Sequence, residues 1–423
     1  MRIGIISQWY EPEPGPAALP AVMARALAAR GHEVCVLTGF PNYPSGSIFP
    51  AYRQRLLLKE LMGGVEVFRT PLFPSHDGSA GRRIANYVSF AISATLAGIP
   101  FFPRVDVLWV NYSPVTVAVP MWLEQLLHGT PAVCEVADLW PDTLAVSGIS
   151  GSSRLLSAGR GWLDKWCARI YASSDAVVHI SPSVGNVLGT RGVPRHKLKY
   201  IPKPANELLF HNHGNSIRAE LGIDENAIVL LYAGSMGAAQ GLEALIEACS
   251  LIEDDRFVML MAGSGLREDA LRRQAKAVSP RNVRFLGRVP QESMSDLMAT
   301  ADAAFISLEQ NPLSEMTMPS KTQVALACGR AVLVAGSGDV AEVVSANGVG
   351  FIAVPGSAPS IAGAIGELVA VGRGGLMKLG ATARRLYEDE FSMRRTTTLI
   401  EDLLEEVVVA AGRPQRCKGL RHD

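Results

Sequence analysis

Short apolar runs alternate with stretches of helical periodicity along residues 1–201. Apolar runs of about four to eight residues bounded by turn formers predict buried strands, and longer stretches with apolar residues three and four apart predict helices. The predicted strands are 3–7, 34–38, 65–69, 107–111, 132–136, 176–180 and 198–201. The helices predicted between them are 17–29, 84–99, 115–127, 155–173 and 182–191. Strands that are apolar throughout are typical of a parallel sheet with both faces covered.

The alternation stops at residues 202–216, a polar and turn-rich linker, and then resumes. The strands predicted there are 228–233, 257–262, 283–286, 303–307, 331–334 and 350–354. The helices are 241–251, 266–278, 292–300, 321–328, 340–346, 359–388 and 393–411. We therefore predict an α/β chain of two doubly wound, Rossmann-like domains, 1–205 and 206–390, with a cleft between their strand ends.

The end of the chain completes this organisation. A helix at 391–411 is expected, and packing of that helix back on the first domain is an arrangement left open. The tail 412–423 is polar and basic, and we expect it to be disordered.

The composition narrows the classes of function. The 423 residues are 48% hydrophobic and 19% charged, which indicates a globular protein with an ample core. Forty basic and forty acidic residues balance, so no overall field favours nucleic acid. Six cysteines without Cys-x-x-Cys spacing are typical of reduced thiols rather than metal ligands. The longest apolar segment, 84–102, contains several polar residues and predicts a buried helix, although contact with a membrane surface stays open.

Two loop-to-helix junctions in the second domain carry candidate chemistry. The apolar run 230–233 leads into Gly234-Ser235-Met236-Gly237 and then a helix. Glycine lets backbone N–H groups approach an anion, and a helix N-terminus adds partial positive charge. A second helix start, ending in Lys321, precedes the segment 325–332. Together the two junctions predict a cradle for a diphosphate.

Further landmarks extend this pattern over almost the whole chain. They are the segments 9–15, 29–34, 234–237, 262–265, 285–290 and 327–332. In this order they resemble the retaining glycosyltransferases of family 4, which have the GT-B fold. The segments 37–44 (Leu-Thr-Gly-Phe-Pro-Asn-Tyr-Pro), 138–142 (Asp-Leu-Trp-Pro-Asp) and 319–321 (Pro-Ser-Lys) resemble more narrowly the fucosamine-type transferases of bacterial surface polysaccharides.

The chain departs from the family pattern at several positions. The family carries two glutamates, eight residues apart, for the donor sugar and the ribose, and this chain has Met316 and Val324 there. Glu315 lies next to the first position. Gln240 replaces a basic residue, and Ala137 replaces a histidine. The change at Val324 removes a ribose hydrogen-bond acceptor and leaves the choice between UDP and GDP open.

Lys321 is the first candidate for contact with the donor and for catalysis. A lysine in the first turn of a helix is unfavourable unless an anion offsets it, the alternative being a solvated side chain. The resemblance implies that the backbone at Gly287 faces the nucleobase, whereas an ordinary turn is the simpler interpretation. The predicted donor-binding residues are Gly15, Gly234, Ser235, Met236, Gly237, Gln240, Gly263, Gly287, Arg288, Val289, Glu315, Ser320, Lys321 and Thr322.

Three residues at strand ends of the first domain are candidates for the acceptor. Asp138 follows an apolar strand and is expected to orient an acceptor hydroxyl as a catalytic residue, or to cap the next helix. Asn111 and Ser113 end another strand and are candidates for acceptor contact. Gly15 opens a helix that faces the donor, or serves only as a turn glycine between two prolines.

These features predict a metal-independent, retaining glycosyltransferase that uses a nucleoside-diphosphate sugar and no cofactor. The acceptor is a lipid-linked sugar of polysaccharide assembly or a small molecule of a secondary-metabolite (antibiotic) pathway. The balanced charge mildly favours the small molecule. A sugar-nucleotide epimerase and a non-catalytic partner subunit are the alternatives. We expect a cytoplasmic protein with at most peripheral membrane contact and no nucleic-acid partner, and a homodimer stays open.

Overall fold

The computed structural model describes residues 1–76, 79–143, 154–278 and 281–412, and divides the chain into two compact units. Unit 1 comprises Met1–Ile201 and the segment from Thr397 onward, and unit 2 comprises Pro202–Thr396. The boundary therefore falls at 201/202, ahead of the predicted 205/206. The predicted tail lies, from residue 413, outside the described residues.

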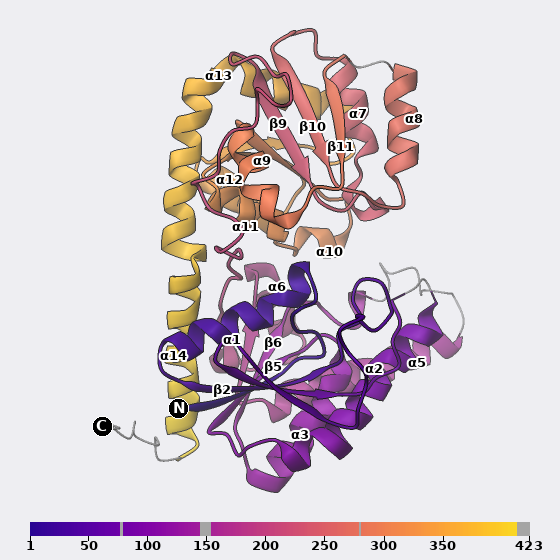
Figure 1. Ribbon diagram of the computed structural model, residues 1–423, viewed down its shortest axis with the longest axis vertical. Coiled ribbons are helices and arrows are strands. Elements are labelled where there is room, and N and C mark those ends of the chain that lie inside the picture. Colours follow the sequence, from indigo (N-terminus) through magenta and orange to yellow (C-terminus); the bar gives the residue numbers. More distant parts are fainter. Residues whose placement is uncertain (77–78, 144–153, 279–280, 413–423) are drawn as a thin grey trace. The chain divides into compact units, whose positions relative to one another are not determined.

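Unit 1 contains an eight-stranded sheet in the order β3-β4-β2-β1-β5-β6-β7-β8. Figure 1 labels its strands β2, β5 and β6. The strands are β1 Arg2–Ile6, β2 Glu33–Gly39, β3 Leu58–Met62, β4 Val65–Thr70, β5 Val107–Asn111, β6 Ala132–Val136, β7 Ala176–His179 and β8 Leu198–Tyr200. All pairs are parallel except β3 with β4. The sequence analysis missed β3 because its partly charged residues lack the apolar run of the buried strands.

The helices of unit 1 cover both faces of this sheet. They are η1 Gly15–Ala18, α1 Leu19–Ala29, α2 Ala80–Ser93, η2 Ala94–Gly98, η3 Ile99–Phe101, η4 Val115–Val117, α3 Ala118–His128, α5 Arg154–Ser173, α6 Pro182–Thr190 and η5 Arg195–Lys197. The last helix, α14 Met393–Ala410, contributes Ile400, Leu404 and Val408 to the same core as β1 and α1. Glu401 on this helix accepts hydrogen bonds from Arg30 and pairs with His32, which fastens it to unit 1.

Unit 2 contains a six-stranded, wholly parallel sheet in the order β11-β10-β9-β12-β13-β14. The strands are β9 Ile228–Ala233, β10 Phe257–Ala262, β11 Val283–Gly287, β12 Ala303–Ser307, β13 Ala331–Ala335 and β14 Gly350–Ala353. The helices are η6 Ala238–Gln240, α7 Glu243–Ser250, α8 Glu268–Val278, η7 Gln291–Ser293, α9 Met294–Thr300, α10 Pro312–Glu315, α11 Ser320–Ala327, α12 Asp339–Ala346, α13 Ala358–Leu386 and η8 Tyr387–Phe391.

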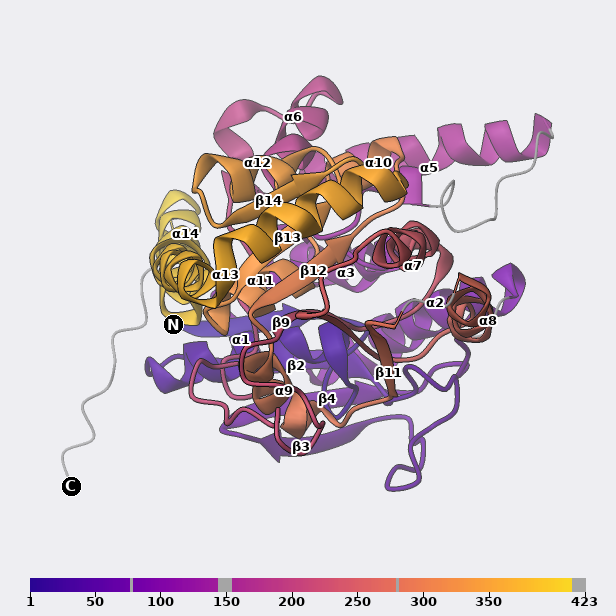
Figure 2. The same cartoon turned by 90° about the horizontal axis from the view of Figure 1, so that it is seen from above.

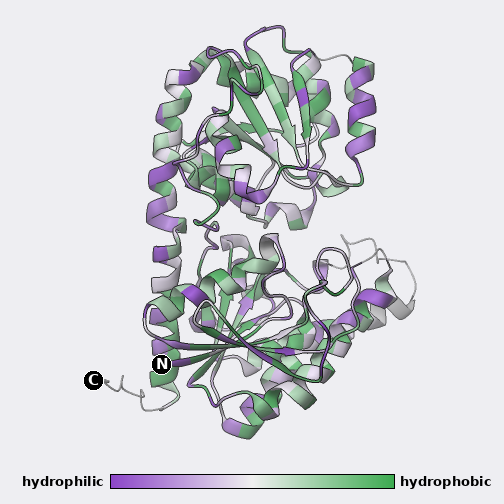
Figure 3. Ribbon diagram, viewed as in Figure 1, coloured by the Kyte–Doolittle hydropathy of each residue, from purple (hydrophilic) through white to green (hydrophobic). Residues whose placement is uncertain are grey.

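Alternate residues of β9 enter two separate cores on the two faces of the sheet in unit 2. Val229 and Leu231 pack with residues of α9, α11 and α12, whereas Leu230 and Tyr232 pack with α7, α8 and α13. Figure 2 shows these helices on both sides of the strands, and Figure 3 shows β9 and β10 hydrophobic along their length. The two Rossmann-like folds predicted from the alternation are confirmed.

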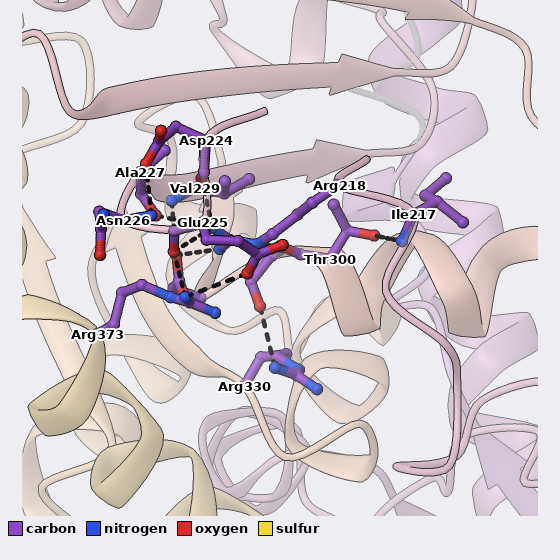
Figure 4. A network of polar contacts seen from close by, with 12 residues as sticks. Ile217, Arg218, Asp224, Glu225, Asn226, Ala227, Val229, Thr300, Arg330 and Arg373 are labelled. Carbon is purple, nitrogen blue, oxygen red and sulfur yellow. Dashed lines mark hydrogen bonds and ion pairs between the residues drawn. The ribbon is translucent and has the colours of Figure 1, made fainter. Parts of the chain in front are cut away.

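A buried ion pair holds the amino-terminal ends of β9 and β12 together (Figure 4). Arg218, only 2% exposed, donates to Asp302 at 2.7 Å and to the carbonyl oxygens of Thr300 and Ala227. Asp302 also accepts the backbone N–H of Val229 at 2.7 Å. The network lies at the opposite end of the strands from the loops that follow β9 and β12. It therefore stabilises the sheet without involving those loops.

Candidate donor and acceptor sites

The candidate donor residues of unit 2 follow four adjacent strands of its sheet. Gly234 follows β9, Gly263 follows β10, Gly287 ends β11, and Lys321 lies beyond β12 at the start of α11. The chain leaves β9 toward β10 and β11 and then returns to β12 on the other side of β9. Ligands of open α/β sheets bind at the carboxyl ends of strands where the strand order reverses, and Gly234 and Lys321 lie on either side of that point.

The glycine loops after β9 and β10 pack against each other at backbone distance. Gly263 has φ of +135°, and a Cβ there would collide with the carbonyl oxygen of Gly234. Gly234 has φ of +142°, and its added Cβ would lie 2.5 Å from Cε of Lys321. Glycine at these two positions lets the lysine chain and both loops meet in one place, which a residue with a Cβ would prevent.

Hydrogen bonds within the chain reduce the number of loop amides that are available to hold a phosphate. Gly234 N–H donates to the carbonyl of Ala262 at 2.9 Å, and Met236 N–H donates to Ser264 at 2.9 Å. Gly237 N–H donates to the side-chain oxygen of Gln240 at 3.0 Å. Three of the four amides expected to hold a phosphate are thus already bonded within the chain.

The remaining amide of this loop belongs to Ser235. Its N–H has no acceptor among the described residues, and its side chain is exposed. Met236, predicted to bind the donor, has a fully buried side chain in the core under the loop. Gln240 caps the turn through its bond to Gly237. In this loop only Ser235 therefore retains both a free amide and an accessible side chain for a ligand.

Lys321 is a largely enclosed cation without a carboxylate. Its Nζ donates to the hydroxyl of Tyr232 at 2.6 Å and lies 4.0 Å from the centre of that ring. Tyr232 in turn donates to the carbonyl of Ser235. Tyr232 is the one polar partner of Lys321 within the described residues. Burial lowers the pKa of Lys321 from 10.5 to about 8, because no negative charge compensates for lost hydration.

The first turn of α11 also holds a polar side chain without a hydrogen-bond partner among the described residues. The hydroxyl of Thr322 is fully buried and has no hydrogen-bond partner among the described residues. Ser320 is exposed beside it. Val324, where the family has its ribose-binding glutamate, is partly buried and packs against the core of unit 2. The polar side chains of α11 that are candidates for ligand contact therefore lie in its first turn.

The other predicted donor residues lie around the same strand ends. Glu315 ends the short helix α10 and is exposed. Arg288 is exposed after β11, whereas Val289 packs against the core. Glu309 donates its backbone N–H to Ala239 at 2.9 Å, which joins the loop after β12 to the turn after β9. The structure thus brings these loops to one edge of the sheet.

Two of the acceptor candidates in unit 1 touch each other. Ser113, which follows β5, donates its hydroxyl to Asp138 at 2.6 Å. Asp138 follows β6 and is exposed, and Asn111 at the end of β5 is half-buried. Gly15, after β1, opens η1 and is exposed with φ of +66°. Because β1 and β5 are adjacent and the strand order reverses between them, these residues mark the corresponding edge of unit 1.

Sequence reasoning missed two residues that organise these regions. Tyr232 is the partner of Lys321, and its one signal was an aromatic residue in an otherwise aliphatic strand directly before a glycine. Glu13 is 2% exposed and accepts the backbone N–H groups of Tyr10, Asn42 and Tyr43. It thereby ties the segment 9–15 to the segment 37–44, and burial raises its pKa to about 7.

Comparison with known proteins identifies the domains of the chain. Residues 15–204 match the glycosyl transferase 4-like domain and residues 215–384 match the glycosyl transferases group 1. The putative colanic acid biosynthesis glycosyl transferase WcaI of Escherichia coli K12 is 27% identical over 356 residues, covering 79% of this chain and 83% of WcaI. The two matched segments together span most of the chain, which is therefore a transferase enzyme built from glycosyltransferase domains.

Solved structures agree on the fold. Sucrose-phosphate synthase from Thermosynechococcus elongatus superposes with a TM-score of 0.71 at 18% identity, covering 97% of this chain and 99% of the synthase. HepE from Anabaena, in complex with UDP and glucose, gives 0.67 at 16% identity and covers 96% and 100% of the two chains. These neighbours establish the GT-B fold.

Proposed function

We propose that this enzyme transfers a sugar from a nucleoside diphosphate and that Lys321 holds the diphosphate. The observation that carries the proposal is a partly buried ammonium with no carboxylate partner among the described residues, at the strand ends where α/β sheets bind ligands. A buried charge without a partner costs free energy, and an arriving diphosphate removes that cost. Such unpaired groups are typical of functional sites rather than of the core.

The same ammonium has a role in the chemical step. Negative charge grows on the diphosphate as the bond to the sugar breaks, and a fixed cation stabilises that charge more than it stabilises the ground state. The Ser235 amide, which has no acceptor among the described residues, is the further donor that we assign to the phosphates, and the buried Thr322 hydroxyl lies in the same helix turn as Lys321. We infer no metal ion and no cofactor in this step.

The acceptor is assigned to unit 1. Asp138, held by Ser113 at 2.6 Å, is suited to accept a hydrogen bond from an acceptor hydroxyl and orient it. We infer retention of the anomeric configuration by front-face attack, with the donor phosphate taking the acceptor proton. Both inferences follow the family resemblance.

The acceptor class that we favour is a lipid-linked sugar of surface polysaccharide assembly. The relative WcaI is named for colanic acid, a polysaccharide product, and the fucosamine-type motifs of this chain point the same way. A small soluble acceptor is the second candidate, supported by the balanced overall charge. UDP and GDP are both candidate carriers.

A turnover experiment tests the proposal. The native enzyme is incubated with a panel of UDP- and GDP-sugars, with and without lipid-linked and soluble acceptors, and release of nucleoside diphosphate is measured. Lys321→Ala is expected to lose at least about a hundredfold in turnover, since removing one stabilising donor costs roughly 3 kcal/mol. Lys378→Ala, an exposed lysine of α13, is the matched control. Equal rates for the two variants would contradict the proposal, and the anomer seen by proton NMR tests retention.

A further inference from the structure

Helix α2 and its continuation through η2 and η3 expose a row of apolar side chains in addition to the apolar side chains that they bury. The side chains of Ile84, Val88, Ile92, Leu96 and Phe101 are 55%, 41%, 54%, 72% and 62% exposed. The first four are spaced four residues apart, so they form one ridge along the outer face of the helix. Ordinary surface helices place such a ridge against the core.

The inner face of this segment is mostly apolar, with Phe90, Ala94 and Ile99 buried, and it also carries polar side chains bonded to the rest of unit 1. Asn86, 1% exposed, accepts from Gln8 at 2.5 Å and donates to the carbonyl of Phe73 at 2.7 Å. Ser93 donates to the carbonyl of Pro71 at 2.5 Å. These buried bonds fix the helix on unit 1, where it lies beside α3 (Figure 1). The sequence analysis expected a buried helix, and the structure corrects this for the outer face.

The charged residues within the ridge segment itself are all basic. Between residues 79 and 105 the chain has three arginines, Arg82, Arg83 and Arg104, and no aspartate or glutamate. Arg82 lies over the ring of Phe73 at 5.7 Å, and Phe73 is itself 43% exposed. Arg104 is exposed at the other end of the ridge. The whole chain has balanced charge, so the ridge segment is more basic than the chain as a whole.

We propose that this ridge docks unit 1 on an anionic lipid surface, with the arginines at the headgroups and the apolar side chains at the acyl boundary. The segment Ala80–Phe101 has the length and hydropathy of a membrane span. Its inner polar bonds oppose removal from unit 1, because each broken buried bond leaves an unsatisfied group. The segment therefore lies in the interface plane rather than crossing it. The arginines at both ends of the ridge complement anionic headgroups, which favours a lipid surface over a protein partner.

The docking proposal is argued from residues of unit 1 alone. Its connection to a lipid-linked acceptor rests on the proposed function. An enzyme held at the surface meets such an acceptor by diffusion in two dimensions. Asp138 and Ser113 belong to the same unit as the ridge, so the acceptor residues stay with the docked surface.

Co-sedimentation with vesicles tests the proposal on the full chain. We expect binding to mixed phosphatidylcholine–phosphatidylglycerol vesicles and much weaker binding to phosphatidylcholine alone. Ile92→Ser with Leu96→Ser should weaken binding at least about tenfold, since two exposed apolar side chains lose their burial. The matched control replaces Leu208 and Met377, which are 76% and 75% exposed in unit 2, by serine and should bind as the native chain does.

A second variant tests the charge. Arg82→Gln with Arg104→Gln should weaken binding to anionic vesicles by about thirtyfold, each arginine near a surface being worth roughly 1 kcal/mol. Absence of vesicle binding by the native chain overturns the proposal. So does equal binding by the ridge and control variants, or a ridge variant that alters only the sedimentation velocity of the chain without lipid, which would indicate self-association.

The same variants separate this proposal from the proposed function. Thermal shifts by UDP and GDP should be equal in the native chain and the ridge variants, because the ridge lies in unit 1 and the donor candidates follow the strands of unit 2. Lys321→Ala should keep vesicle binding and lose the nucleotide shift. Failure of the nucleotide shift in the native chain would count against the donor site and leave the vesicle result standing.

Discussion

Replacing Lys321 by methionine should make the free enzyme more stable while removing its affinity for diphosphate. The lysine pKa falls from 10.5 to about 8 on folding, because burial removes hydration and no carboxylate replaces it. That difference corresponds to roughly 3 kcal/mol of unfavourable free energy. The methionine variant also loses the hydrogen bond to Tyr232, which destabilises it by about 1 kcal/mol and offsets part of the gain. The net gain for Lys321→Met is therefore about 2 kcal/mol.

The gain in stability of Lys321→Met should decrease as the pH rises. The folded chain binds the Lys321 proton more weakly than the unfolded chain, so stability rises with pH between about 8 and 10.5. The cost of burying the charge is present in full below pH 8 and declines above it. The advantage of the methionine variant should accordingly be largest at pH 7 and fall by more than about 2 kcal/mol by pH 10.

Urea unfolding followed by circular dichroism at pH 7 and pH 10 measures both effects. Lys378→Met, at an exposed position of α13, should change stability by less than about 0.5 kcal/mol at either pH. A loss of stability in Lys321→Met at pH 7 would refute the reasoning, because it would mean that the ammonium is already compensated in the free enzyme. An equal gain at both values of pH would refute the assignment of that gain to charge.

Three further predictions follow from other contacts. Gly234→Ala places a Cβ 2.5 Å from Cε of Lys321, so titration calorimetry should show at least tenfold weaker diphosphate binding with little change in fold (about 1.4 kcal/mol or more). Arg218→Ala removes the closer of the two arginines paired with Asp302 and the donor to two buried carbonyl oxygens, and should cost about 2–3 kcal/mol in urea unfolding, since Arg373 stays 3.2 Å from Asp302. Asp138→Asn should lower turnover about a hundredfold, while the affinity for nucleoside diphosphate, measured by thermal shift, stays unchanged.

The fold was predictable where apolar runs decide the structure. The strands 228–233, 257–262 and 303–307 match β9, β10 and β12 residue for residue, because continuous burial on both faces demands continuous apolar sequence. Strand β3 escaped because it pairs only with β4 at the edge of the sheet and tolerates charged residues. The outward apolar face of α2 escaped because periodicity does not tell which face meets the core.

The site was predictable in its residue types and less so in its bonding. Lys321 stood out because a cation at a helix N-terminus is unfavourable alone. The pairing of Gly234 with Ala262, and of Met236 with Ser264, depends on how two parallel loops align, which no local pattern records. The segment 202–216 was predicted only as a polar linker, yet its residue Glu207 accepts hydrogen bonds from the Tyr387 hydroxyl and the Met393 backbone N–H, which no local pattern indicates.

Proton uptake on nucleotide binding tests the central claim most directly. Calorimetric titration of UDP or GDP at pH 8, in buffers of different ionisation enthalpy, counts the protons taken up. In the enzyme without nucleotide, Lys321 is about half protonated at that pH. Beside a diphosphate it should be fully protonated, so the native enzyme should take up about half a proton. Lys321→Met should bind more weakly and take up none. Tight binding with the same proton count in both forms would contradict the account.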